Sequence, residues 1–102
     1  MSATLTDNGD GAWRIEGVLD FVSVTDLFRR TREIMGGGDA VTLDLSGVER
    51  ANSAGVALLL EWRREARRRG IEIELAGLPE AVLRVARLSG VEEVLERGTA
   101  AL

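Results

Sequence analysis

The turn formed by Asn52, Ser53, Ala54 and Gly55 contains the residues best suited to a chemical role. A serine hydroxyl at such a turn can accept a backbone hydrogen bond as a helix N-cap, contact a partner, or receive a phosphoryl group. Gly55 would lie in the first turn of the following helix, where glycine costs up to about 1 kcal/mol relative to alanine. A close approach by a neighbouring loop or by a partner would explain this glycine.

Most of the groups that enzymes use are missing from this chain. Its 102 residues include no histidine and no cysteine, and all 13 basic residues are arginine. Imidazole bases, thiolates, disulfides and cysteine or histidine zinc sites are therefore excluded, and the glycine run 36–38 lacks the lysine of a phosphate-binding loop. Asp44 near a strand end and Ser53 at a helix start have no base or metal ligand beside them. We predict a protein that is not an enzyme and has no metal site and no cofactor.

Length and hydropathy indicate one soluble domain. A chain of this size with 45% apolar residues buries roughly two thirds of its unfolded surface in a single core. No basic segment followed by an apolar one stands at the start. The longest apolar run, 54–60, is far shorter than the roughly 20 residues of a bilayer helix. We expect a cytoplasmic protein without direct membrane insertion.

Segment 63–69 contains a cluster of arginines. Basic side chains near a helix C-terminus interact favourably with the helix dipole and are usually solvated. The formal charge of the whole chain is -4, and no aromatic residue is interleaved with the cluster. We therefore expect no nucleic-acid partner.

The first third of the chain predicts a hairpin and a helix. Segments 3–6 and 13–19 alternate apolar and polar residues on either side of a stretch rich in glycine, asparagine and aspartate. This pattern predicts an antiparallel hairpin. Apolar residues at helical spacing then predict one helix from about 22 to 35, with Ser23 or Thr25 as its cap.

The rest of the chain predicts a parallel crossover. Strands 41–46 and 71–75 flank a long helix over 53–69, and such a connection is right-handed. Both strands alternate strictly, so only one face of the sheet should be covered. A helix with Pro79 in its first turn, ending near residue 88, and a short helix over 91–97 follow. We expect an α/β fold: a mixed four-stranded sheet with an N-terminal hairpin and about four helices mainly on one face.

The long helix carries two stripes on a helical wheel. The core stripe consists of Val56, Leu59, Trp62 and Ala66. The second stripe begins at the helix cap and has small or apolar residues where charged ones are usual. It consists of Ser53, Ala57, Leu60 and Arg64, flanked by Glu61 and Arg68. Leu60 by itself would also fit an ordinary scattered surface residue, but the pattern as a whole predicts a contact surface.

Segment 52–62, and more broadly 41–94, resembles STAS domains. Ser53-Ala54-Gly55, followed after Val56 by Ala57-Leu58-Leu59-Leu60, is most similar to MlaB-type proteins, the small cytoplasmic subunits of phospholipid-transporting ABC systems. Anti-sigma-factor antagonists are the next most similar group. The resemblance implies a single STAS domain over residues 1–102, whose tail from about residue 98 we expect to be flexible.

The resemblance also implies a partner. A MlaB-type protein would be a non-catalytic subunit that docks on the ABC transporter ATPase subunit and supports its assembly or activity, in the cytoplasm and held at the inner membrane through that ATPase. The partner-binding residues would be Asn52, Ser53, Ala54, Gly55, Ala57, Leu60, Glu61 and Arg64.

The alternative implied by the resemblance is an anti-sigma-factor antagonist. Its partners would be an anti-sigma factor and a serine kinase, and Ser53 would be its phosphorylation site. The family pattern usually has aspartate before this serine, whereas this chain has Asn52. The missing charge favours docking over phosphorylation. An independent lipid or nucleotide binder is a weaker third alternative because no pocket-forming motif is visible.

Overall fold

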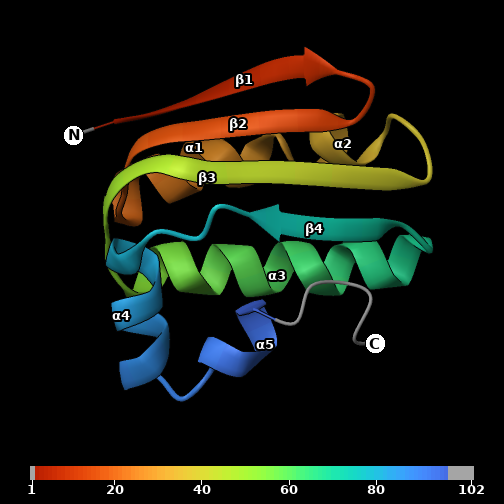
Figure 1. The fold of residues 1–102 in the computed structure, drawn as a ribbon. Coiled ribbons are helices and arrows are strands. Elements are labelled where there is room, and N and C mark those ends of the chain that lie inside the picture. The colour runs from red at the N-terminus through yellow and green to blue at the C-terminus, as the bar shows by residue number, and fades with distance from the viewer. Residues whose placement is uncertain (1, 97–102) are drawn as a thin grey trace.

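The computed structural model describes residues 2–96, so the tail predicted to be flexible from about residue 98 lies outside the described residues (Figure 1). The described elements are, in order, β1 (Ala3–Gly9), β2 (Ala12–Leu19), α1 (Phe21–Arg29), α2 (Thr31–Met35), β3 (Ala40–Ala51), α3 (Ser53–Arg69), β4 (Glu72–Ala76), α4 (Glu80–Leu88) and α5 (Glu92–Glu96).

The four strands form one mixed sheet in the order β1-β2-β3-β4. β1 and β2 pair antiparallel, whereas β2 with β3 and β3 with β4 pair in parallel. Gly9, Asp10 and Gly11 all adopt positive φ at the hairpin turn, as their residue types predicted. The α/β class, the mixed sheet and the N-terminal hairpin are confirmed.

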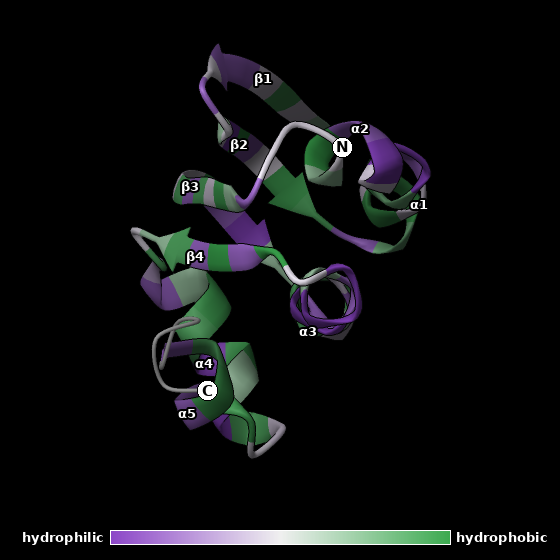
Figure 2. Ribbon diagram, turned by 90° about the vertical axis from the view of Figure 1, so that its right-hand side faces the viewer, coloured by the Kyte–Doolittle hydropathy of each residue, from purple (hydrophilic) through white to green (hydrophobic). Residues whose placement is uncertain are grey.

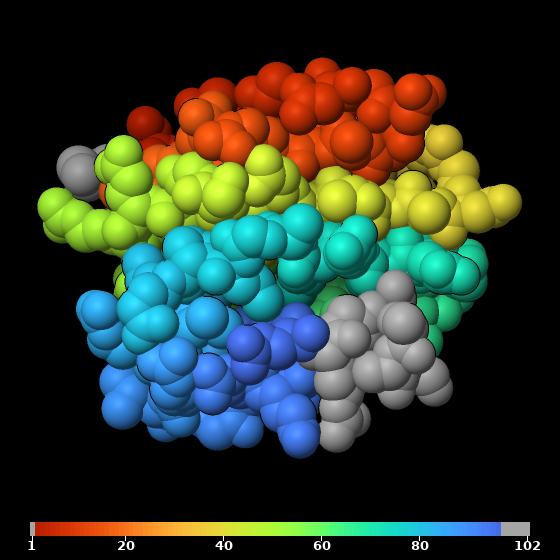
Figure 3. All heavy atoms as spheres, in the orientation of Figure 1, coloured from red at the N-terminus to blue at the C-terminus, as the bar shows by residue number. Residues whose placement is uncertain are grey.

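The helices that the structure describes cover one face of the sheet. α1, α2 and α3 lie together on one side, and α4 and α5 lie beside the β4 edge (Figure 2). On β3, Val41, Leu43 and Leu45 are buried, whereas Thr42 pairs with Glu74 of β4 on the open face. This open face is the one turned toward the viewer in Figure 3. The alternation of the two strands therefore predicted the layer arrangement correctly.

The predicted single helix over 22–35 is wrong, because the segment forms two helices separated at Arg30. The N-cap of α1 is Asp20, whose carboxylate accepts from the backbone N–H groups of Val22 and Ser23. Ser23 is not the cap: its hydroxyl accepts from the Asp20 N–H and donates to a backbone carbonyl of β2. This capping box starts the helix earlier than predicted.

The break after α1 coincides with a contact made across the fold. The Thr31 hydroxyl donates to the Phe28 carbonyl at 2.6 Å and accepts from the Trp62 indole N–H of α3 at 2.9 Å. The hydroxyl thus satisfies a carbonyl at the end of α1. This break gives five described helices instead of about four.

Other element boundaries also differ from the prediction. β3 continues to Ala51 instead of ending at 46, and it pairs with β2 from Thr42 to Ala51 with two irregularities in register. β4 begins at Glu72 and not at 71. Pro79 is the N-cap residue of α4 and precedes its first turn. The extension of β3 carries the chain directly to the start of α3.

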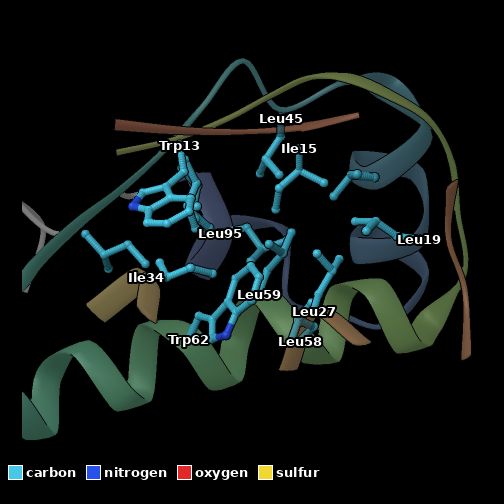
Figure 4. Packing of buried hydrophobic residues seen from close by; sticks show 14 of the residues in the cluster. Trp13, Ile15, Leu19, Leu27, Ile34, Leu45, Leu58, Leu59, Trp62 and Leu95 are labelled. Atoms are coloured by element: carbon cyan, nitrogen blue, oxygen red, sulfur yellow. The ribbon is translucent and has the colours of Figure 1, made fainter. Parts of the chain in front are cut away.

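The core lies between the covered face of the sheet and α3 (Figure 4). Trp13, Ile15 and Leu45 point from the strands toward Leu59 and Trp62 of the helix. The predicted core stripe of α3 is confirmed, since each of its four residues is at most 3% exposed. α3 is therefore fixed by its inner side, and its outer side faces away from the sheet.

Candidate docking surface

The turn at Asn52 lies at the end of the sheet where β2 and β3 finish and two helices begin. Leu19 is the last residue of β2 and pairs with Ala51, the last residue of β3. The Asn52 N–H donates to the Leu19 carbonyl at 3.0 Å, which extends this pairing by one more bond. The N-termini of α1 and α3 therefore lie next to each other, each directly after a parallel strand.

The N-cap of α3 is Asn52. Its backbone is extended, with φ −120° and ψ −170°, and its side-chain oxygen accepts from the Ala54 N–H at 2.9 Å. Ser53 is the first helical residue and is exposed. Among the described residues, none forms a hydrogen bond with the Ser53 hydroxyl. The interpretation of Ser53 as the helix cap is therefore wrong, and its hydroxyl does not stabilise the helix start.

Gly55 is buried on the inner side of α3. A Cβ at this position would lie 2.7 Å from the Cβ of Leu19 and 3.4 Å from the Leu19 carbonyl oxygen. The close approach that explains this glycine is therefore made by β2 of the same chain. Gly55 was predicted to bind a partner, but the structure places it between the helix and the sheet and not on the outer surface.

The remaining predicted residues share the outer side of α3. Ser53, Ala57 and Arg64 are exposed, whereas Asn52, Ala54, Leu60 and Glu61 are half-buried. We call this set, without Gly55, the α3 surface. Within the α3 surface Arg64 pairs with Glu61, so these two charges, toward the C-terminal end of the surface, neutralise each other. The surface thus presents a small polar start, an alanine at its centre and a leucine beside an ion pair.

The arginine cluster at the end of α3 is not uniformly solvated. Arg68 and Arg69 donate hydrogen bonds to Glu65, and these bonds lower the pKa of its carboxyl group. Arg63, in contrast, is only 6% exposed. Burial, followed by the nearby charge of Arg67, lowers the pKa of its guanidinium below the ordinary value. The expectation of a solvated cluster is wrong for Arg63, and its place between Val56 and Leu59 on the helical wheel could have indicated this.

A pocket adjoins the α3 surface on the side of α5. Its volume is about 190 Å³, and its described lining residues are Leu60, Arg63, Arg64, Arg67 and Val94. No pattern in the sequence indicated this pocket, because it requires α5 to lie against α3.

Exposed aromatic residues of α1 were also missed. Phe21 is 69% exposed and Phe28 is 51% exposed, two helical turns apart on the same side of α1. Their spacing of seven residues places them on one side of a helix, and this could have been noticed in the sequence. They extend the apolar character of the molecule beyond α3 to the neighbouring helix.

The open face of the sheet carries a separate polar cluster. Arg14 of β2 donates to the Asp44 carboxylate at 2.6 Å and to the Ser46 hydroxyl at 3.1 Å. Hydrogen bonds from the backbone and the hydroxyl of Ser46, and then Arg14, lower the pKa of Asp44. Asp44 is thus an ion-paired group that joins neighbouring strands.

Within residues 2–96, no group of three or more acidic, histidine or cysteine side chains is arranged to hold a metal ion. No helix in that range has the length and apolarity needed to cross a bilayer.

A family profile described as "Mlab, STAS domain" matches residues 4–96, which is nearly the whole chain. The chain belongs to the STAS family. STAS domains are generally non-catalytic modules that act through protein–protein interactions. Membership of this family is consistent with a non-catalytic regulatory protein.

Solved structures show the same fold. The anti-sigma factor antagonist SpoIIAA in its unphosphorylated form is 19% identical, with a TM-score of 0.68 over 88% of this chain and 82% of that one. An anti-sigma factor antagonist from Mycobacterium paratuberculosis is 22% identical, with a TM-score of 0.69 over 92% of this chain and 83% of that one. At such identities the likeness establishes the STAS fold alone. No curated protein matches this STAS domain in sequence.

Proposed function

We propose that this STAS domain is a non-catalytic subunit that docks on the ATPase of a phospholipid-transporting ABC system and supports its assembly or activity. The observation that carries the proposal is the α3 surface: the fold leaves the Ser53 hydroxyl exposed and places Ala57 and Leu60 along the same outer side. The Mlab description of the matching family profile supports the transporter assignment. The protein would then be held at the inner membrane through the ATPase.

The composition of the α3 surface suits a helix or loop of a partner. Ala57 is exposed at its centre, and so small a side chain lets a partner backbone approach closely. The Glu61–Arg64 pair borders it with polar groups, as the rim of an interface usually does. Asn52 and Ala54 complete the upper end beside the helix start. A bulky charged side chain at Ala57 would therefore block contact along the whole surface.

The proposal is tested by co-purification with a candidate ATPase, that of a phospholipid-transporting ABC system of the same organism. Wild type should co-purify, and Ala57→Arg should be lost from the complex, because an arginine replaces the smallest exposed side chain of the surface. Leu88→Arg is the matched control, since Leu88 is 85% exposed on α4 and lies outside the α3 surface. Wild type that fails to co-purify, or Ala57→Arg that is retained like the control, contradicts the proposal.

A second function, that of an anti-sigma-factor antagonist switched by phosphorylation, is favoured by one observation. The Ser53 hydroxyl is exposed at a helix N-terminus, where a phosphate of about −1.5 to −2 charges would be stabilised by the helix itself. A partner pressed against that phosphate would be repelled. Neighbouring genes for a sigma factor and a serine kinase, with loss of anti-sigma-factor binding by Ser53→Asp, would establish this role in place of the transporter role.

A further inference from the structure

We propose that the pocket beside α3 receives an acidic side chain, an aspartate or glutamate, of the protein that docks on the α3 surface. We call the pocket, with its lining residues Leu60, Arg63, Arg64, Arg67 and Val94, the arginine pocket. This inference rests on the proposed function in so far as it requires a protein partner on α3.

The arginine pocket is continuous with the α3 surface. Leu60 and Arg64 belong to both, so a partner that covers the surface also reaches the pocket entrance. The pocket lies on the side of α3 that faces α5, which contributes Val94. Figure 1 shows where α5 lies relative to α3. Its volume of about 190 Å³ is below the range of about 300 to 1,000 Å³ that is typical of small-molecule sites. The volume therefore fits one side chain better than a separate ligand.

The charge of the arginine pocket selects an anion. Three of its described lining residues are arginines, and no described lining residue is acidic. Glu61 and Glu65, the two carboxylates of α3, already pair with Arg64, Arg68 and Arg69. Arg67 forms no ion pair with any of the residues that the structure describes. The helix has no carboxylate left to neutralise it.

The pocket also matches the shape of a carboxylate on an apolar stem. A planar guanidinium offers paired N–H donors whose spacing fits the two oxygens of a carboxylate. Leu60 and Val94 provide apolar walls for the methylene groups of the same side chain. Burial and, after it, the nearby charge of Arg67 disfavour the charged form of Arg63, and a carboxylate beside the exposed Arg67 offsets the second of these effects.

The test measures the affinity of the purified candidate ATPase for wild type, Arg67→Glu and Arg67→Ala. Arg67 is exposed, so both variants should keep the fold, which the urea midpoint checks. Arg67→Glu should lower the affinity at least about tenfold, and Arg67→Ala should lower it less. Arg32→Glu is the matched control, because this exposed arginine of α2 makes the same change in net charge away from the pocket; its affinity should stay within about twofold of wild type.

A charge exchange identifies the occupant. Each exposed aspartate or glutamate of the ATPase is changed to arginine, and one of these variants should restore binding to Arg67→Glu. If Arg67 had only a structural role, no such ATPase variant would restore the affinity of Arg67→Glu. Tight binding of Arg67→Glu by the unmodified ATPase, or the absence of any rescuing variant, overturns the acidic side chain as occupant.

Two further outcomes separate the proposals. If wild type does not bind the ATPase at all, the docking function fails and the inference fails with it; if wild type binds and Arg67→Glu binds equally well, only the arginine pocket is wrong. If wild type without ATPase sediments with phosphatidylglycerol vesicles and Arg67→Glu does not, the pocket binds a lipid phosphate, which also overturns the inference.

Discussion

At the scale of single residues, Asn52 and Ser53 divide two tasks that one residue often combines. The Asn52 side chain accepts the Ala54 N–H and so caps α3. The Ser53 hydroxyl, one position later, stays exposed at the same helix start. The stability of the helix is therefore separated from the chemistry available at its N-terminus. A change at Ser53 should therefore test the proposed docking without weakening the fold.

This division predicts unequal effects of two alanine substitutions. Asn52→Ala should lower the free energy of unfolding by about 1 kcal/mol, because it removes the N-cap of α3. Ser53→Ala should change it by less than about 0.5 kcal/mol, because no described residue hydrogen-bonds to its hydroxyl. Urea unfolding followed by circular dichroism measures both. Equal losses for the two variants would show that Ser53 shares the capping role.

Both residue types are favoured N-caps, so composition could not choose between Asn52 and Ser53. The choice is made by β3, whose last residue Ala51 pairs with Leu19 and brings Asn52 to the cap position. Arg63 shows the opposite situation. Its neighbours on the helical wheel, Val56 and Leu59, already placed it at the margin of the core, but its charge favoured the solvated interpretation.

At the scale of elements, the packing of α3 against β2 depends on the glycine in its first turn. Gly55 allows the helix to approach the Leu19 side chain so closely that an added Cβ would lie 2.7 Å from the Leu19 Cβ. The glycine costs helix propensity but permits this contact. The orientation of the α3 surface relative to the sheet is therefore set at the helix start.

Gly55→Ala should lower the free energy of unfolding by about 1 to 2 kcal/mol, although alanine is the better helix former. The reason is the overlap with Leu19, which α3 can relieve only by moving away from β2. Urea unfolding measures the loss. Gly37→Ala is the control, since a Cβ there would meet no atom within 4 Å, and it should leave the free energy unchanged or slightly higher. A higher free energy of unfolding for Gly55→Ala than for wild type would show that the contact with Leu19 does not limit how closely α3 approaches β2.

Helical periodicity predicted the region of α1 and α2 but not their separation. Leu27 and Ile34, on either side of Arg30, are seven residues apart and so fit one helical period, because both helices bury one side against the core. The break is associated with Thr31, whose hydroxyl binds the Phe28 carbonyl and the Trp62 indole. Thr31 and Trp62 are 31 positions apart, and such a contact leaves no periodic signal in the sequence.

At the scale of the whole molecule, a sheet covered on one face explains the strict alternation of β3 and β4. The fold class was readable because a solvated face requires a polar residue at every second position. The arginine pocket could not be predicted from such a pattern. It arises where α5 meets α3, and neither helix shows by its own pattern which part of the other it will contact.

The stability of the whole molecule should fall with acid and change little near neutrality. Several described carboxyl groups have a lowered pKa, among them Asp20, Asp44, Glu65 and Glu80, through hydrogen bonds to their charged forms. Each contributes stability above its unfolded pKa, 3.8 for aspartate or 4.5 for glutamate, and loses it as the pH falls through the lower folded value. With no histidine in the sequence, the unfolding free energy should stay nearly constant from about pH 6 to about pH 8.

Urea unfolding over a pH series measures this profile, with Asp44→Asn as the comparison. The variant cannot lose the stabilising charge of Asp44 on acidification, so its free energy should fall less below pH 3.8 than that of wild type. A large change between about pH 6 and about pH 8, or parallel acid profiles for the two proteins, would contradict the assignment.

The bond from the Asn52 N–H to the Leu19 carbonyl has a consequence for mapping the partner by nuclear magnetic resonance. It joins the start of α3 to the end of β2, directly before Asp20 and α1. A ligand that touches only Ser53 and moves this bond will also shift the amide resonances at the start of α1. Chemical-shift changes at Phe21 and Val22 will therefore overstate the footprint, and cross-saturation, which requires direct proximity, gives the true boundary.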